Sequence, residues 1–449
     1  MKQKYFNDTV AAIATPAGEG GIAVLRVSGP HALIFSKRIL SYKGTLRPRT
    51  VKLAALSTGE VSDEVMLLYF KSPRSFTGED VLEIHCHGSY FLAQKVVEAL
   101  LQNGCRAAEP GEFTRRAFLN GRIDLTKAEA VLDLIRAKSQ SEVTAAYRQL
   151  RGGIFNEADA LQKRLTDLIA SASAAVDYPE DDIISPAKRE ILDGAQSVKL
   201  ALTKLKDSFK GGRLLREGVR VAIIGLPNAG KSTLLNRLLG AERAIVTAEP
   251  GTTRDTVEET FIYRGVRFVV TDTAGIRAAA TEAERLGIQR SLAAAEGADV
   301  ILRVEDGTGE ANITELTKIT TENKPVIVVK NKLDLARLDK TTDNTMPCPS
   351  SISISALTGE NVELLKERLY GETVGKISAH GASICNLRQL DAVTRAAEAL
   401  ERLSISEQLS LDCMLSDLYE ASRALGSITG ITATDAVVDA IFAQFCVGK

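Results

Sequence analysis

The residues best suited to chemistry form a glycine-rich run, Gly225 to Ser232 (GLPNAGKS), which matches the pattern G-x-x-x-x-G-K-[ST]. In such a loop, backbone N–H groups curl around phosphate oxygens and a helix N-terminus adds positive partial charge. Lys231 would reach the outer phosphates, and the Ser232 hydroxyl would bind magnesium. The run follows an apolar stretch, 219–224, and precedes a helix-like stretch, 233–239. It therefore predicts a nucleotide-phosphate site.

Three further motifs follow, each after an expected strand. In Asp272-Thr273-Ala274-Gly275, the Asp can hold magnesium through water and the Gly N–H can meet the γ-phosphate. In Asn331-Lys332-Leu333-Asp334, the last carboxylate could accept both the ring N–H and the exocyclic amine of guanine, a donor pair that adenine lacks. A backbone N–H of Ser355-Ala356-Leu357 could reach the guanine carbonyl. Each motif is weak alone, but the ordered set indicates GTP.

The residue after Gly275 departs from a common pattern. Many regulatory GTPases place a Gln there to orient the attacking water, whereas this chain has Ile276, which cannot hydrogen-bond water. Another group must orient the water and neutralise charge, and the nearby candidates are Arg254, Arg277, Glu282, Glu284 and Arg285. Most charged residues in such a stretch are simply solvated, so the residues alone leave this choice open.

The spacing of apolar residues predicts the elements that must position these motifs. Strands alternate with helices from about 219 to 370, which predicts a parallel sheet with both faces covered. The expected strands are Val219 to Ile224, Val266 to Thr271, Val300 to Val304, Val326 to Val329 and Ile352 to Ile354. Helical spacing prevails from 125 to about 210 and again after 377. These flanks predict that the α/β unit is inserted into a helical domain.

The amino-terminal region reads differently. Short apolar runs at 22–27, 65–70 and 81–84 lie between Gly, Pro and Ser, which predicts an α+β domain. The expected fold class is therefore multidomain α/β and α. We expect an amino-terminal domain at 1–120, a discontinuous helical domain at 121–214 and 377–449, and a GTPase domain at 215–376.

Composition narrows the class of protein. The chain has 449 residues, 45% hydrophobic and 25% charged, with a formal net charge of −1, as in an ordinary globular protein. No apolar run approaches the roughly 18–20 residues that span a bilayer. The six cysteines include no CxxC pair, which argues against a disulfide framework or zinc knuckle. We expect a cytoplasmic protein. Residues 1–120 carry a surplus of four positive charges, which tolerates a nucleic acid partner without identifying one.

Two other signals favour ordinary explanations. His85 and His87 would share one strand face while Cys86 points away, with no fourth ligand in sight, so a metal site is disfavoured. Cys446 is fourth from the end, but Gly448, Lys449 and the lack of a preceding basic run argue against prenylation. A thiol role for Cys446 and simple packing of the tail both stay open.

At this point the chain resembles a known family. The run with Pro227 and Asn228 is similar to translation-associated GTPases that use potassium, held by the Asn and by a loop before Gly-Thr-Thr-Arg-Asp, here 251–255. The segments 14–29, 75–80 (SFTGED), 110–120 (PGEF to Asn120) and the tail 445–449 (FCVGK) resemble the MnmE (TrmE) family of tRNA modification GTPases. The resemblance covers essentially the whole chain.

The resemblance implies a specific activity. The amino-terminal domain would be similar to folate-binding one-carbon enzymes and would form a homodimer. With a flavoprotein partner, MnmG (GidA), in a heterotetramer, the protein would add an aminomethyl-type group at carbon 5 of the wobble uridine of certain tRNAs. The one-carbon unit would come from a tetrahydrofolate derivative, in its 5-formyl or methylene form.

The resemblance also implies site residues. The folate would face Arg26, Glu83, Arg122 and Lys449, where Arg122 replaces the usual Lys and so changes the hydrogen-bond geometry. Potassium would be held by Asn228, Thr247, Glu249 and Thr252, with Glu249 replacing a commoner apolar residue, and magnesium by Ser232 and Thr253. Glu284 matches the water-orienting glutamate. The GTP-binding set is Asn228, Ala229, Gly230, Lys231, Ser232, Thr233, Thr247, Thr252, Thr253, Asp272, Thr273, Ala274, Gly275, Asn331, Lys332, Asp334, Ser355, Ala356 and Leu357.

A different class of function stays open from the residues alone. A GTP-switched ribosome-assembly or RNA-binding factor would carry the same nucleotide motifs without any modification chemistry. Binding of a reduced folate would separate the two, because an assembly factor should not bind it.

Overall fold

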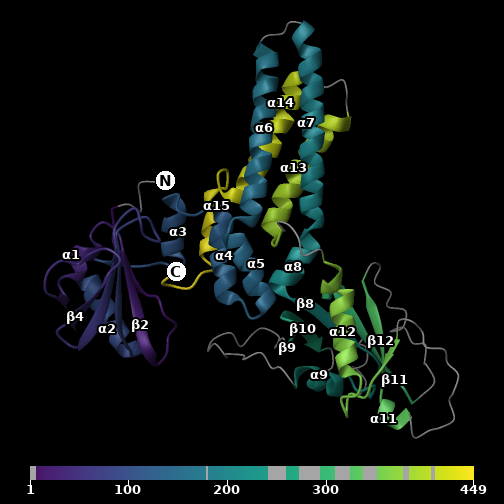
Figure 1. Ribbon diagram of the computed structural model, residues 1–449, viewed down its shortest axis with the longest axis horizontal. Coiled ribbons are helices and arrows are strands. Elements are labelled where there is room, and N and C mark those ends of the chain that lie inside the picture. The colour runs from purple at the N-terminus through teal and green to yellow at the C-terminus, as the bar shows by residue number, and fades with distance from the viewer. Residues whose placement is uncertain are drawn as a thin grey trace. The chain divides into compact units, whose positions relative to one another are not determined.

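The computed structural model describes residues 7–177, 181–240, 259–272, 294–308, 324–336, 351–377, 384–405 and 410–449 (Figure 1). The chain divides into two compact units. The first comprises Met1–Leu132, Gln149–Leu202 and Asp391–Lys449, and the second comprises Asp133–Arg148 and Thr203–Leu390. No helix among the described residues is long and apolar enough to cross a membrane.

The amino-terminal part of the first unit is built on a seven-stranded sheet with the order β3-β4-β5-β6-β2-β1-β7. Its strands are β1 (Val10–Ile13), β2 (Gly20–Ser28), β3 (Leu40–Ser41), β4 (Val51–Ser57), β5 (Ser62–Phe70), β6 (Val81–Gly88) and β7 (Arg106–Ala107). All neighbours pair antiparallel except β1 and β7. The short helix α1 (Ala32–Ser36) follows β2, α2 (Tyr90–Gln102) follows β6 and α3 (Glu112–Leu119) follows β7.

The two faces of this sheet differ. The apolar stripe of α2, which includes Val96 and Leu100, packs on strand residues such as Leu25 and Ile84 to form the core. On the opposite face, α3 covers β1 through Phe113, which packs on Val10 and Ala12. Farther along that face, Val51 and Leu53 of β4 are 65% and 62% exposed. Part of the sheet thus presents apolar side chains to solvent.

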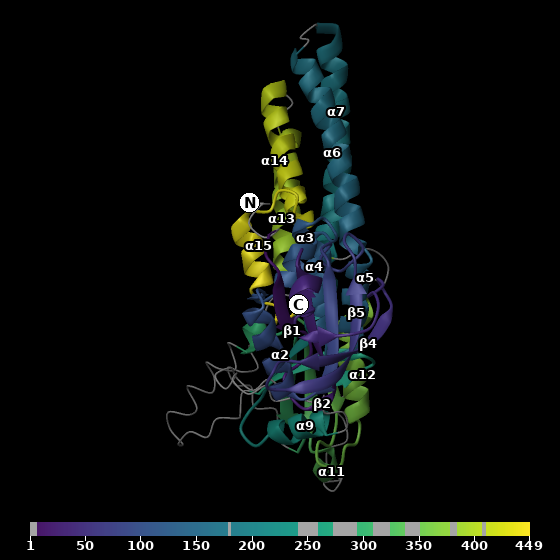
Figure 2. The same ribbon diagram turned by 90° about the vertical axis from the view of Figure 1, so that its left-hand side faces the viewer.

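Four long helices of the first unit form a bundle, in which α6 and α14 lie side by side in both views (Figures 1 and 2). Gly194 of α7 fits against Leu168 of α6, and Gly426 of α14 lies against Gln162 of α6. Lys199 of α7 pairs with Glu401 of α13. The other helices of the first unit, some of which extend into the second at one end, are α4 (Leu125–Arg136), α6 (Gly153–Asp177), α7 (Asp181–Asp207), α13 (Leu387–Ile405), α14 (Leu411–Thr429) and α15 (Asp435–Phe442). The helix α5 (Gln140–Leu150) belongs mostly to the second unit.

The second unit contains a six-stranded sheet with the order β13-β12-β11-β8-β10-β9, parallel except for the edge strand β9. Val221 and Ile223 of β8 pack against α9 and α12, whereas the intervening Ala222 and Ile224 pack against the segment 294–298. Both faces are therefore covered. The elements are α8 (Phe209–Glu217), β8 (Val219–Ile224), α9 (Lys231–Leu239), β9 (Glu259–Tyr263), β10 (Val266–Asp272), β11 (Val300–Asp306), β12 (Val326–Asn331), α11 (Leu333–Ala336), β13 (Ser351–Ser353), α12 (Val362–Glu372) and a 3₁₀ turn (Val374–Lys376).

The predicted fold class is confirmed: a sheet with parallel strands and helices on both faces accompanies helical segments and an α+β amino-terminal region. The expected strand Val219 to Ile224 coincides with β8, and the other expected strands of this sheet match to within a few residues. The sequence reading did not anticipate β1, β4 or β9. The division into three domains stays a prediction.

Candidate functional site

The glycine-rich run occupies the turn between β8 and α9, with Lys231 as the first residue of the helix. Gly225 has φ +156°, and a Cβ there would lie 2.2 Å from the Val304 carbonyl oxygen. Gly230 has φ +88°, and its Cβ would lie 2.2 Å from Asn331 Nδ2. Lys231 Nζ donates to the carbonyls of Gly225 and Leu226 at 2.9 and 2.8 Å. The loop is compact enough that only glycine fits at both positions.

Asn331, at the end of β12, joins two of the predicted motifs. Its side chain is buried, its Nδ2 donates to the Ala229 carbonyl at 2.9 Å, and its Oδ1 accepts from the Ala356 N–H at 2.9 Å. The Asn331 amide therefore joins the glycine-rich run 225–232, which we call the phosphate-type loop, to the loop after β13. The Ala356 N–H is therefore already used, and the Ser355 N–H donates to the Glu360 carbonyl at 3.1 Å. Among the described contacts of these three residues, the Leu357 N–H is the one left for a guanine carbonyl.

The carboxylate expected to read guanine is itself held in place. Asp334, in the short helix α11, accepts a hydrogen bond from the Ser355 hydroxyl at 2.5 Å. The neighbouring Lys332, at φ +68°, forms an ion pair with Asp306 at 2.6 Å. Although burial acts to raise it, the pKa of Asp306 is lowered to about 2, chiefly by hydrogen bonds from Lys332 and Thr308. Three predicted motifs thus converge at the carboxyl ends of β8, β12 and β13.

Sequence reasoning missed Arg237, which lies on α9 beyond the phosphate-type loop. Its Nε donates to the Ala356 carbonyl at 3.1 Å, and its Nη2 donates to the Leu357 carbonyl. Arg237 thus links the helix that begins with Lys231 to the loop after β13. No local signal identifies it, because its acceptors lie 119 and 120 residues further along the chain.

Some other predicted residues of this site lie near the ends of the described segments, and the rest lie outside the described residues. Asp272 is the last residue of β10, in register with Ile223 of β8. Ser232 and Thr233 lie in the first turn of α9. The following predicted or candidate residues lie outside the described residues: Thr247, Glu249, Thr252, Thr253, Arg254, Thr273, Ala274, Gly275, Ile276, Arg277, Glu282, Glu284 and Arg285.

A second candidate site lies on the amino-terminal sheet. Arg26 of β2 and Glu83 of β6 are directly opposite in the ladder, and Arg26 Nη2 is 2.8 Å from Glu83 Oε1. The guanidinium lies 5.6 Å from the ring centre of Phe76, a side chain that is 38% exposed. His85 Nε2 is 3.4 Å from the other oxygen of Glu83. A carboxylate beside an accessible aromatic ring suits a flat heterocycle with N–H donors.

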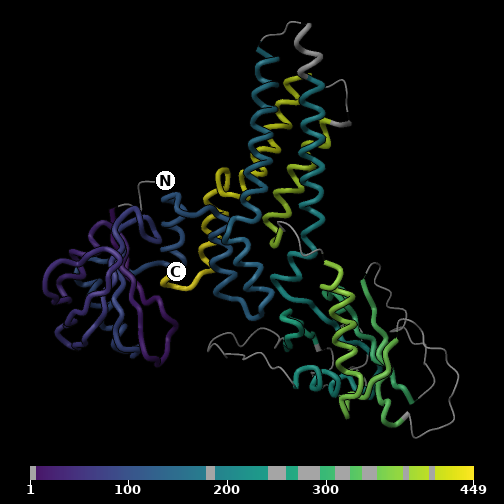
Figure 3. Tube along the Cα trace, in the orientation of Figure 1, coloured from purple at the N-terminus to yellow at the C-terminus, as the bar shows by residue number. Residues whose placement is uncertain are grey.

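The carboxyl-terminal tail reaches this site. The Phe113 N–H donates to the main-chain oxygen of Lys449 at 3.1 Å, and Gly448, at φ +95°, packs against the Ile13 carbonyl. Figure 3 shows the yellow carboxyl-terminal tail ending beside the amino-terminal part of the first unit. Burial lowers the pKa of Lys449, the charge of Arg26 acts in the same direction, and the Glu83 carboxylate opposes both. The Lys449 ammonium therefore lies within electrostatic range of the Arg26–Glu83 pair, although more than 360 residues separate them in sequence.

Arg122 borders the same site through a loop. Its Nε donates to the Ser75 carbonyl at 3.2 Å, and its side chain packs on Gly78 at φ +82°. Ser75 precedes Phe76, whose ring contacts Arg26. Arg122 and Arg26 therefore contact neighbouring residues of one loop, while Glu83 pairs with Arg26.

A buried charge network holds the loop that carries Phe76, because Glu79 of that loop pairs with Arg116. Arg116 is 1% exposed and pairs with Asp8, Glu79 and Glu112 at 2.7, 3.1 and 2.8 Å. Burial raises the pKa of Glu79, although Arg116 acts against it. Burial also acts to raise the pKa of Glu112, but hydrogen bonds from Arg106 and the Glu109 N–H bring it below its usual range. Through Arg116 the network links Glu112 of the PGEF segment to Glu79 of the SFTGED segment.

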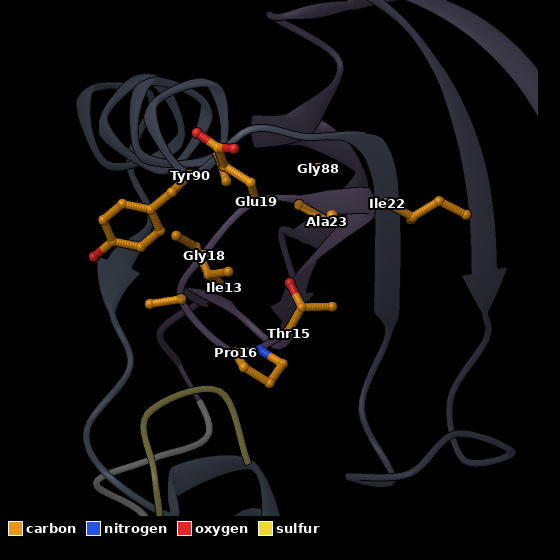
Figure 4. A pocket seen from close by; sticks show the side chains of 12 residues that line it. Ile13, Thr15, Pro16, Gly18, Glu19, Ile22, Ala23, Gly88 and Tyr90 are labelled. Atoms are coloured by element: carbon orange, nitrogen blue, oxygen red, sulfur yellow. The ribbon is translucent and has the colours of Figure 1, made fainter. Parts of the chain in front are cut away.

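A hollow of about 250 Å³ lies beside the turn between β1 and β2 (Figure 4). Ile13, Thr15, Pro16, Glu19 and Tyr90 are among the residues that line it (Figure 4). None of Arg26, Glu83, Arg122 or Lys449 lines it. We call Arg26, Glu83, Arg122 and Lys449 the charged cluster. Of the two features, the charged cluster holds the groups that could do chemistry, so we place the candidate folate site there and not in the hollow.

Comparisons with known proteins agree with this picture. The family described as "MnmE helical domain" matches residues 125–446, and the family described as "GTP-binding protein TrmE N-terminus" matches residues 9–122. A tRNA modification GTPase MnmE of Koribacter versatilis (strain Ellin345) is 41% identical over 456 residues, 99% of each chain. A protein of the same name from Synechococcus sp. (strain CC9605) is 44% identical over 455 residues, 98% of this chain and 99% of its own.

Among solved structures, Era of Aquifex aeolicus bound to GDP·AlF4⁻ is 30% identical, covering 40% of this chain and 66% of its own, with a TM-score of 0.26. The full-length relatives and the two family matches decide the assignment. The chain belongs to the family of tRNA modification GTPases MnmE.

Proposed function

We propose that this chain is a potassium-dependent GTP hydrolase that acts with a flavoprotein partner, MnmG (GidA), on tRNA. Together they would install an aminomethyl-type group at carbon 5 of the wobble uridine, using a one-carbon unit from a tetrahydrofolate derivative. Membership of the MnmE family supports the coarser part, GTP hydrolysis in tRNA modification. The convergence of Lys449 with Arg26 and Glu83 carries the folate part.

The charged cluster fits a reduced folate. Glu83 would accept hydrogen bonds from the N–H groups of the pterin ring, and Phe76 would pack against its face. Arg122 and Lys449 would bind the carboxylates of the glutamate tail. The folate supplies the one-carbon unit when bound. The residues of this chain bind and orient it, and the partly buried Lys449 limits access of water.

The nucleotide site requires cations. We propose that Ser232 and Thr253 bind magnesium, that Asn228, Thr247, Glu249 and Thr252 bind potassium, and that Glu284 orients the attacking water. Asn228 lies in the phosphate-type loop with φ +65°, and its side chain is exposed. A monovalent ion there would supply the positive charge that an arginine finger supplies elsewhere.

We also propose a homodimer through the amino-terminal sheet. Val51, Leu53 and Ile22 are more than half exposed on the face that α2 does not cover. Apolar groups gathered on one sheet face mark an interaction surface. If two copies of the chain paired through this face, each would cover the exposed apolar residues of the other. A monomeric mass in sedimentation at micromolar concentration would contradict this proposal.

The folate assignment is tested by Glu83→Gln. We expect the affinity for 5-formyltetrahydrofolate to fall by about 10- to 100-fold, because hydrogen bonds to a charged group are worth about 1.5–3 kcal/mol. Isothermal titration calorimetry on the full chain measures it. Glu64→Gln, an exposed carboxylate on the neighbouring strand β5, serves as control and should bind normally. Equal affinity of wild type and Glu83→Gln would remove the folate from this site.

Potassium dependence is a separate prediction. GTP turnover should be faster in potassium than in sodium, because sodium is too small for a site built from Asn228 and loop carbonyls. Asn228→Ala should abolish the difference and leave slow basal hydrolysis. The measurement is phosphate release at constant ionic strength in each salt. Equal wild-type rates in the two salts would refute the proposal.

A further inference from the structure

Four basic side chains gather at one end of the β4–β5 hairpin, and we call them the basic cluster: Arg47, Arg49, Lys71 and Arg74. Arg47 and Arg49 lie just before β4, and Lys71 and Arg74 lie just after β5. Because Val51 of β4 pairs with Leu68 of β5, the two loops meet at the same end of the hairpin. All four side chains are exposed.

Hydrogen bonds hold the two loops together. The Arg49 N–H donates to the Tyr69 carbonyl at 2.8 Å, and Arg49 Nη2 donates to the Arg74 carbonyl at 3.1 Å. Arg49 has φ +61°, a backbone conformation uncommon for a residue other than glycine. The cluster is therefore fixed by backbone contacts, and its cations do not depend on a carboxylate for their placement.

The charge of the cluster is not compensated locally. Among the described residues, none of the four forms an ion pair with Asp or Glu, in contrast to Arg106 and Arg116 of the same domain. The loop after β5 holds two carboxylates, and both are engaged: Glu79 pairs with Arg116 at 3.1 Å, and Asp80 accepts from the Ser72 N–H at 2.8 Å. Burial together with Asp80 raises the pKa of Tyr69 to about 12. Four cations thus face solvent, and both carboxylates of the loop after β5 already have other partners.

The cluster borders the candidate folate site. Arg74 directly precedes Ser75, whose carbonyl accepts from Arg122, and Phe76, whose ring contacts Arg26. A polyanion that bound the cluster would therefore lie beside the residues that would hold the one-carbon donor. Spaced cations from two loops suit a ligand with repeated charges better than a single phosphate, which would need convergent donors.

We propose that the basic cluster binds the phosphate backbone of tRNA and so holds the substrate beside the folate-type site. This inference rests on the proposed function for its substrate class. Phosphate contacts of this kind fix the position of the RNA and do not read its sequence. The cluster should therefore contribute equally to binding of different tRNAs.

The test uses Arg47→Gln/Lys71→Gln in the full chain, because neither side chain makes a described hydrogen bond. The control is Lys37→Gln/Arg38→Gln, which removes two exposed cations of the same domain. Ser57, at the far end of β4, donates to the Ile39 carbonyl, so the control pair lies at the opposite end of the strand. Seven strand residues put about 20 Å between the two ends.

Filter binding of two transcribed tRNAs, one with and one without a wobble uridine, is measured from 50 to 200 mM KCl. Each lost phosphate contact lowers the slope of log K against log salt by about 0.7–0.9. The cluster variant removes two cations, so we expect the slope for both tRNAs to become less steep by about 1.4–1.8, and the control to keep the wild-type slope. An unchanged slope, or an equal loss in the control, would overturn the proposal.

Two further measurements distinguish binding of tRNA by the basic cluster from a role of the cluster in folate binding or GTP hydrolysis. Affinity for 5-formyltetrahydrofolate and basal GTP turnover should not change in the cluster variant, because neither residue belongs to those sites. If the variant weakened only a polyglutamylated folate, the cluster would bind the glutamate tail and the inference would be wrong. If wild type bound tRNA with the expected slope but no folate at all, the proposed function would fail while the basic cluster stood.

Discussion

Replacing Arg116 with alanine is expected to lower the free energy of unfolding of the amino-terminal domain by about 3–5 kcal/mol, the usual cost of breaking a buried ion pair from one side. Arg116 is 1% exposed and pairs with Asp8, Glu79 and Glu112. Without it, Asp8 and Glu112 keep Arg106 as a partner, whereas Glu79 keeps no ion-pair partner among the described residues. Hydrogen exchange of the β2 and β6 amides in increasing urea measures the domain separately from the rest of the chain.

The loss should depend on pH in a defined direction. The pKa values of Asp8 and Glu112 lie below their usual range, since hydrogen bonds from Arg106 and Arg116 outweigh burial. Their stabilisation is therefore present at neutral pH and is lost as the pH falls through the lowered values. In the variant these pKa values rise, so the folded state takes up protons earlier. The difference from wild type should thus be largest near pH 7 and should shrink on acidification.

Two variants sharpen this result. Arg116→Lys keeps the charge but cannot reach all three carboxylates, so an intermediate loss is expected. Lys95→Ala removes a cation that also has two carboxylate partners, Glu60 and Glu98, but at the surface, and it should change stability little. A loss in Arg116→Ala no greater than in Lys95→Ala would mean that the network is hydrated and does not support the domain.

The phosphate-type loop could be predicted from sequence because all its parts are contiguous: an apolar strand, glycines and a helix that begins at Lys231. The central strands were predictable for a similar reason, since strands buried on both faces read as continuous apolar runs. By contrast, β4 escaped prediction. Its Val51 and Leu53 are exposed while Ala54 and Leu56 are buried, so apolar residues occupy both faces and the alternating pattern is lost.

Long-range groupings could not be predicted from the residues alone. Only the family resemblance predicts that Arg26, Glu83 and Lys449 share a site, because no local sequence signal links the tail to β2. Arg116 reads as an ordinary surface residue in EFTRRAFL, since a charged pair on a short helix is normally solvated. Its burial depends on acids that lie 37 and 108 residues away. Arg237 is hidden for the same reason.

Asp334→Asn is expected to weaken GDP binding by about 10- to 100-fold, because charge-assisted hydrogen bonds of this kind are worth about 1.5–3 kcal/mol. The Ser355 hydroxyl, which donates to Asp334, should keep the oxygen of the new amide and so turn its NH2 toward the base. That NH2 cannot accept from the guanine amine, but it can donate to the 2-carbonyl of xanthine. The variant should therefore bind XDP more tightly than wild type does.

Arg237→Ala should behave differently, and the contrast decides the assignment of both residues. Arg237 holds the Ala356 and Leu357 carbonyls, so its loss should loosen the loop that we expect to face the 6-carbonyl. Guanine and xanthine share that carbonyl, so GDP and XDP should weaken by the same factor. Competition against a fluorescent nucleotide measures both affinities. An Asp334→Asn protein with the wild-type ratio of GDP to XDP affinity would show that this carboxylate does not read the base, because only its own contacts distinguish the two rings.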